Sequence, residues 1–198
     1  PRTTLTVGYN YQIRPIYTRQ IALLTFGYNW MKNNQVQHIL TPVTLNSVKV
    51  EPTPSFAQIL EKETNQRIKD QYTSHLIFGL DYTYIFNNQD VRFLKDFFYF
   101  KANIQSSGNL ISLLNNTSLV KTIDNYHEIF GIRYAQFARL SLDFRYFKYI
   151  IGENQIATRF MIGAGIPYGN SNDMPFEKSF YAGGTNGMRG WAFRELGP

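Results

Sequence analysis

The chain has 198 residues, which is enough for one domain with a sizeable hydrophobic core. It contains no cysteine, which excludes disulfide frameworks and thiolate metal sites, and no apolar run approaches the ~20 residues of a transmembrane helix. The formal net charge is +6, but the basic residues are scattered singly among apolar ones, without the Lys/Arg cluster that is typical of nucleic-acid binding.

Apolar and polar residues alternate along successive segments of the chain, which is the pattern of strands with one apolar face. In chain order, we expect strands near 3–13, 17–30, 36–50, 75–87, 97–107, 134–148 and 156–166. The apolar positions are rich in Phe and Tyr, of which the chain has 16 and 14. The segment 36–50 shows the weakest alternation, because Pro42 lies within it and proline cannot donate to a strand ladder.

The connections between these segments differ in length. We expect short turns at 31–35 and 150–155, a modest one near 88–96, and longer excursions at 51–74, at 108–133 and after 166, with only a short link near 14–16. A short helix is expected after Pro54, and another helical turn within 108–116. Short turns at one end and mostly long loops at the other are typical of outer-membrane barrels, whose tilted strands have about ten residues.

The sequence therefore predicts an all-β fold, an antiparallel transmembrane β-barrel of which this chain is an incomplete part. Side chains expected to face lipid are Leu76, Phe78, Leu80, Leu140, Leu142 and Phe144. Polar side chains expected to face the lumen are Arg139, Ser141, Asp143, Arg145 and Arg159. A soluble sandwich or a lipocalin-type barrel also has alternating strands. The aromatic apolar face, the long strands and the mid-strand charges on the opposite face favour the membrane barrel.

No motif in the sequence points to catalysis, a metal or a cofactor. His38, His75 and His127 lie far apart, without the spacing of a metal site. Gly163 and Gly165 follow a predicted strand, but no helix begins after them, so we interpret them as small lumen-facing residues rather than a dinucleotide site. We therefore expect a protein that is not an enzyme.

The segment 167–198 carries an unusual motif. An aromatic residue precedes a Gly-Gly pair, and an Arg-Gly-aromatic stretch follows; the residues are Tyr181, Gly183, Gly184, Met188, Arg189, Gly190 and Trp191. Glycines permit tight turns, and a cation held between them can pair with a carboxylate in an enclosed lumen. The alternative interpretation is a flexible surface loop with an isolated arginine.

This motif resembles the sixth extracellular loop of the BamA/TamA superfamily of outer-membrane assembly and translocation factors, the bacterial surface antigen family. Met188 replaces the usual Val or Ile, Trp191 replaces the commoner Phe or Tyr, and Gly187 stands where Ser is frequent. The stretches 8–15, 87–89 and 168–171 are similar to the TamA-like lipoprotein branch of the family.

The resemblance implies a sixteen-stranded barrel in the bacterial outer membrane, with residues 1–198 running from about its fifth strand to the loop after its eleventh. The remaining strands and the periplasmic repeat domains are then expected elsewhere in the same protein, because an open sheet cannot lie in a bilayer with bare edges. The implied partners are outer-membrane lipids and nascent outer-membrane protein clients, which are inserted or translocated by strand addition at a weak seam. Nucleic acid is not an expected partner.

The resemblance also implies that the loop folds back into the lumen, where Arg189 needs a carboxylate or carbonyl partner. Two other functions remain open. One is a two-partner-type secretion pore of the same superfamily, which carries the same motif. The other, from a different class, is a soluble or surface β-domain that binds a ligand.

Overall fold

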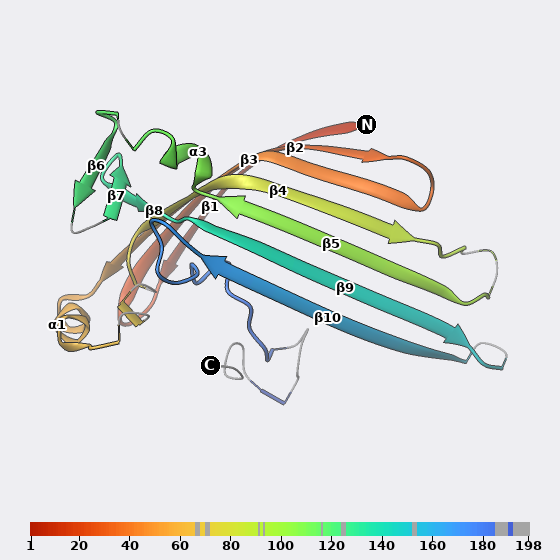
Figure 1. The fold of residues 1–198 in the computed structure, drawn as a ribbon. Coiled ribbons are helices and arrows are strands. Elements are labelled where there is room, and N and C mark those ends of the chain that lie inside the picture. The colour runs from red at the N-terminus through yellow and green to blue at the C-terminus, as the bar shows by residue number, and fades with distance from the viewer. Residues whose placement is uncertain are drawn as a thin grey trace.

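Seven long antiparallel strands form one open sheet in the computed structural model (Figure 1). The structure describes all residues except 66–67, 70–71, 91, 93, 116, 124–125, 152–153, 185–189 and 192–198. In spatial order the strands are β1 (Arg2–Ile13), β2 (Tyr17–Met31), β3 (Val36–Pro52), β4 (His75–Asn87), β5 (Phe97–Ser107), β9 (Phe137–Tyr149) and β10 (Gln155–Pro167). The predicted all-β class with an open antiparallel sheet is confirmed.

The long strands occupy the segments in which apolar and polar residues alternate. The largest difference from the expected bounds is at β9, which begins at Phe137 rather than near 134. The residues just before it form a separate short strand, β8 (Ile132–Tyr134), which pairs in parallel with the start of β4.

β3 continues through Pro42 because a β-bulge accommodates the proline. The register of β3 against β4 changes between Thr41 and Thr44, and the register against β2 changes at the same level. β3 thus carries one extra residue, and a proline is tolerated where the ladder is already interrupted. The extra residue reverses the alternation, so that His38 and Leu45 lie on the same face of the sheet. The weak pattern of 36–50 therefore consists of two regular patterns with opposite phase.

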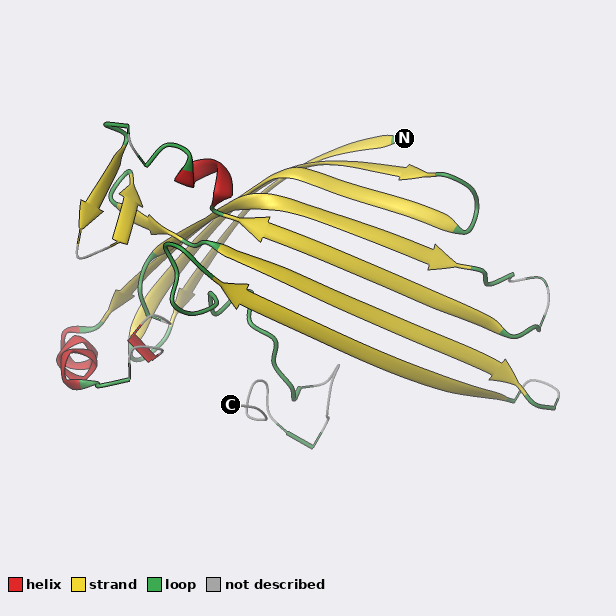
Figure 2. Cartoon of the chain, in the orientation of Figure 1, coloured by secondary structure: helices red, strands yellow, loops and turns green. Residues whose placement is uncertain are grey.

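The connections lie at two opposite ends of the sheet. Residues 32–35, 88–96 and 150–154 connect strands at one end, the turn end; residues 14–16, 53–74 and 108–136 connect them at the other, the loop end, where the chain also leaves β10. The loop end carries α1 (Pro54–Lys62) and α3 (Asn109–Ser112), in the two places where helices were expected (Figure 2). No helix within the described ranges is long and apolar enough to cross a membrane.

The alternation of apolar and polar residues did not predict the two short strands at the loop end, β6 (Val120–Ile123) and β7 (Tyr126–Ile129). β6 pairs with β7, and β7 pairs with β8, so the excursion after β5 forms a small sheet of its own. Strands of three or four residues are too short to show a period of two clearly.

The sheet has an inner and an outer face, and each face is partly covered at the loop end. On the inner face, Ile77 and Phe137 are fully buried, and Met174 from the segment after β10 packs against them. On the outer face, Ile111, Ile129 and Tyr134 form a second cluster, which the outer-face residues of β4 join. Those β4 residues are Leu76 and Phe78, which were expected to face lipid; both are half-buried beneath the excursion after β5.

Candidate functional site

The segment 168–184, which follows β10, turns back and crosses the inner face of the sheet (Figure 1). Two glycines of β10 allow this close approach. A Cβ atom at Gly163 would collide with the ring of Phe180, and one at Gly165 would lie 2.9 Å from Cε of Met174. We interpreted these glycines as small lumen-facing residues. The structure gives the reason for their small size, because a side chain at either position would collide with the segment 168–184.

The side chain of Glu177 attaches the segment 168–184 to two strands of the sheet, β2 and β4. Its carboxylate accepts a hydrogen bond from the guanidinium of Arg19 on β2, and His75 on β4 donates from Nε2 to the other carboxylate oxygen at 2.9 Å. The side chains of Arg19 and His75 are each 9% exposed and that of Glu177 is 15% exposed, so the ion pairs are shielded from water. Nδ1 of His75 lies 2.9 Å from the carbonyl oxygen of Thr73, so both ring nitrogens face an acceptor.

The ionised form of Glu177 is favoured by these neighbours. Burial raises the pKa of a carboxyl group, but the hydrogen bond and charge of His75, together with the charge of Arg19, outweigh burial and hold the pKa of Glu177 below its ordinary value. The neighbouring Lys178 is half-buried, and this partial burial lowers the pKa of its amine. The segment therefore places a carboxylate among cationic groups of the wall.

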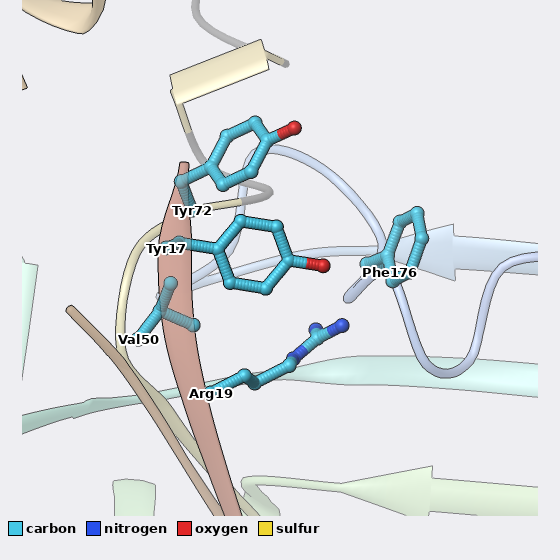
Figure 3. A pocket seen from close by; sticks show the side chains of 5 residues that line it. All are labelled: Tyr17, Arg19, Val50, Tyr72 and Phe176. Carbon is cyan, nitrogen blue, oxygen red and sulfur yellow. The ribbon is translucent and has the colours of Figure 1, made fainter. Parts of the chain in front are cut away.

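A small cavity lies beside this ion cluster (Figure 3). Its walls are Tyr17, Arg19, Val50, Tyr72 and Phe176, and its volume is about 40 Å³. The guanidinium carbon of Arg19 lies 5.1 Å from the centre of the Phe176 ring, and the rings of Tyr17 and Tyr72 meet edge to face at 5.5 Å. Such a space holds water rather than a small-molecule ligand, so the cavity belongs to the packing of the segment.

The polar residues predicted for the lumen lie on this inner face and make two sets of contacts. Asp143 binds Arg145 of its own strand at 2.7 Å and Arg159 of β10 at 2.8 Å. Arg139 donates from Nε to the carbonyl oxygen of Lys178 at 3.0 Å and lies 4.1 Å from the centre of the Phe180 ring. The remaining predicted residue, Ser141, lies between them in the ladder, opposite Gly163 of β10.

The loop motif is only partly described by the structure. Met188 and Arg189 lie outside the described residues. Gly183 and Gly184 have φ of 97° and 86°, which is the left-handed region that favours glycine. The amide of Gly184 donates to the carbonyl oxygen of Trp191 at 2.9 Å, so the two halves of the motif are joined through the backbone. Tyr181 and Trp191 are each 51% exposed, and nothing lies within 4 Å of a Cβ atom placed at Gly190.

Asn170 attaches the start of the segment 168–184 to the excursion after β5. The sequence did not predict this contact. Its side chain donates to the carbonyl oxygens of His127 and Tyr134 at 2.8 Å each and accepts from the amide of His127 at 2.7 Å. Ser171 beside it accepts from the amide of Gln136 at 2.8 Å. These bonds join the start of the segment to the excursion after β5. The stretch 168–171 was noted only for its resemblance to relatives, and no local pattern indicated its partners.

The outer face carries three groups of contacting aromatic rings toward the turn end, which together we call the aromatic belt. Its members are Tyr28, Trp30, His38, Tyr82, Tyr84, Phe86, Phe98, Phe100 and Phe144. The belt crosses five strands; for example, the rings of Trp30 and His38 stack at 5.1 Å, and those of Phe98 and Phe144 at 6.1 Å. Aromatic side chains in such a band are typical of the boundary between lipid and water.

The described residues include no group of three His, Asp or Glu side chains that could hold a metal ion. A family model described as the Omp85 superfamily domain matches residues 2–198. No curated protein matches the chain.

Proposed function

This chain belongs to the Omp85 superfamily, and we propose that it forms part of the barrel wall of an outer-membrane assembly or translocation factor of the TamA-like lipoprotein branch. Proteins of this superfamily are assembly and translocation factors of the bacterial outer membrane rather than enzymes, and they work with nascent outer-membrane proteins. The proposal that the chain is part of such a barrel wall rests on the different chemistry of the two faces of the sheet and on the segment 168–184, which crosses the inner face.

In this proposal, residues 1–198 are one part of an outer-membrane barrel domain, with the outer face toward lipid. The aromatic belt supports this orientation, because its rings lie at one level of the outer face. Exposed aliphatic residues continue the same face toward the loop end, with Leu80 and Leu140 each 41% exposed. The charged residues Arg139, Asp143, Arg145 and Arg159 of β9 and β10 lie on the opposite face, where a water-filled lumen would accept them.

The loop 167–198 is, in this proposal, directed into the lumen and fixed there. The observation that carries the proposal is the buried contact of Glu177 with Arg19 and His75, because it holds the described part of the loop on the inner face. Arg189 follows twelve positions later in the same loop. We assign it the pairing role that the family motif implies, with a carboxylate or carbonyl partner in the intact barrel.

The proposed activity is the insertion or translocation of client proteins at a lateral seam of the barrel. Clients would add strands to an open edge of the sheet, where unpaired backbone N–H and C=O groups are available. The barrel wall described here then contributes its fixed loop and its lipid-facing surface, and the chemistry of the process is hydrogen bonding rather than catalysis.

The experiment compares Arg189→Ala with Arg194→Ala, an arginine outside the motif, in the full-length protein. We expect Arg189→Ala to reduce the level of assembled client barrels in the outer membrane, and Arg194→Ala to leave it unchanged. Arg189→Lys should rescue only in part, because lysine lacks the planar fork of the guanidinium. Full client assembly with both alanine variants would contradict the proposal. Intact client assembly with loss of one secreted protein would indicate the two-partner secretion pore instead.

A further inference from the structure

The excursion after β5 lies on the opposite side of the sheet from the segment 168–184 (Figure 1). We call its described part, α3 with β6, β7 and β8, the outer flap. β8 pairs in parallel with β4, and the outer flap packs its cluster of Ile111, Ile129 and Tyr134 against the outer face. The outer flap therefore covers the loop end of the face that we propose to contact lipid.

The outer flap and its connections also expose apolar side chains. These are Leu110, Leu113, Leu114, Leu119, Ile123 and Phe130. The most exposed of them are Leu113 at 78% and Phe130 at 85%. A segment that has already buried one apolar cluster and still exposes further apolar side chains is unusual in water.

Phe130 is held in an unfavourable conformation at the tip of the outer flap. Together with Gly131 it forms the two-residue turn between β7 and β8, and their φ angles are 55° and 75°. Such a turn favours Asn-Gly, and a bulky residue rarely adopts a positive φ. A strained residue that is 85% exposed points to a role outside the fold rather than within it.

At this end, the outer-face aromatic residues of the long strands are Tyr9 and Tyr11 of β1 and Phe78 of β4, which lies beneath the outer flap. Where β2, β3, β5 and β9 reach the loop end, their outer residues are Gln20, Lys49, Ser106 and Ala138. Along β4, the distance from Phe86 in the aromatic belt to Leu76 under the outer flap is ten residues, about 33 Å along the strand and about 25 Å in height at the usual tilt. That height matches the apolar band of an outer-membrane barrel, so the outer flap lies at its far boundary.

We propose that the outer flap inserts Leu113 and Phe130 into the lipid boundary of the outer leaflet, and so extends over β4 the boundary at which Tyr9 and Tyr11 of β1 lie. The occupant is lipid because the exposed apolar residues of the outer flap continue the apolar outer face at the level where the strands turn polar. The inference rests on the proposed membrane orientation of the sheet.

The 198 residues contain no cysteine, so single cysteines introduced here can report the surroundings of chosen residues once any cysteine elsewhere in the full-length protein is replaced by serine. Phe130→Cys and Leu113→Cys are made in the full-length protein, labelled with an environment-sensitive fluorophore and reconstituted into phosphatidylcholine liposomes. We expect blue-shifted emission, loss of quenching by aqueous iodide, and quenching by a nitroxide placed near the lipid headgroup. Ile59→Cys is the matched control, because Ile59 is also exposed, at 61%, but belongs to α1.

Leu142→Cys separates the two possible failures, because Leu142 is an outer-face residue in the middle of β9. If its label is quenched by a deep nitroxide while the labels at Phe130 and Leu113 remain open to iodide, the outer flap does not contact lipid and the inference is wrong. If the label at Leu142 is also open to iodide, the membrane orientation itself is wrong. Labels at Leu113 and Phe130 that are both shielded, with Ile59 open, support the inference.

Discussion

At the scale of single residues, Glu177 joins parts of the chain that are far apart in sequence. Its partners Arg19 and His75 lie 158 and 102 positions away. Burying the charges of Arg19 and Glu177 and the polar ring of His75 is unfavourable unless each is paired, so the cluster is stable only as a whole. The position of the segment 168–184 on the inner face therefore depends on one carboxylate.

The substitution Glu177→Gln tests this dependence. Glutamine keeps the size of the side chain but leaves Arg19 and His75 buried without an anion, which should weaken attachment of the segment by about 3 kcal/mol. We expect trypsin to cleave after Lys178 in the variant and not in the original protein, where Lys178 is half-buried and its segment is attached to the sheet. Glu51→Gln is the control, because the pair of Glu51 with Lys49 is 53% and 58% exposed; it should leave cleavage unchanged. Equal protection in both variants would contradict a fastening role for Glu177.

Acidification should release the same segment. The folded-state pKa of Glu177 is below its ordinary value of 4.5, so its contribution is complete above pH 4.5 and is lost as the pH falls through the lowered pKa. We expect pepsin to cleave beside Phe180 only once the pH falls below this ordinary value. Glu177→Gln lacks the titrating group and should be cleaved to the same extent at every pH. A protein that stays protected at low pH would show that the carboxylate does not control attachment.

At the scale of elements, the bulge in β3 decides which side chains face inward along half of that strand. Beyond the bulge, Val48 and Val50 are buried on the inner face, and Lys49 lies outside. A slip of one residue would exchange these faces. Pro42 marks the bulge in the sequence, but the extra residue, not the ring, changes the phase.

Deleting a residue beyond the bulge should therefore be far more damaging than deleting Pro42 itself. Without Pro42, Thr41 and Thr44 still face Asp81 and Gly79, so both halves of β3 keep their register and the ladder becomes regular. Deleting Ser47 instead leaves the bulge in place and turns the residues after it to the wrong face, which moves Lys49 to the inner face. We expect the Ser47 deletion to lose the folded, heat-modifiable form in gel electrophoresis, and the Pro42 deletion to keep it. If both deletion variants fold equally well, the alternation of β3 does not decide its register.

The strands that the sequence predicted are long, whereas β6 and β7, which it did not predict, are short. The long strands repeat their pattern over ten or more residues, so β4 and β5 were found with their ends in place. β6 and β7, with four residues each, offer two repeats at most. The inner-face charges of β9 were predicted because they alternate with apolar residues. Glu177 lies in a segment without period, and its partners are distant in sequence, so only the fold could bring them together.

At the scale of the whole molecule, the sheet separates two surfaces with different chemistry. The outer face carries the aromatic belt and exposed aliphatic residues, whereas the inner face carries paired charges and the segment 168–184. In a soluble sheet, the exposed aliphatic face would favour aggregation. In a membrane barrel, the same apolar face contacts lipid, and the edge strands β1 and β10 are paired with further strands.

Two neighbouring positions of β9 test this separation. Leu142 faces outward between Ala102 and Ile162, and Ser141 faces inward. An arginine at position 142 would place a guanidinium in hydrocarbon, so Leu142→Arg should reduce the free energy of unfolding by about 2–4 kcal/mol. Ser141→Asn adds a polar group on the inner face, beside the charged residues of β9, and should change the free energy of unfolding little. The measurement is urea unfolding of the full-length protein in lipid vesicles. Equal destabilisation by the two substitutions would mean that the outer face is not in lipid, because only a hydrocarbon environment distinguishes so sharply between adjacent residues of one strand.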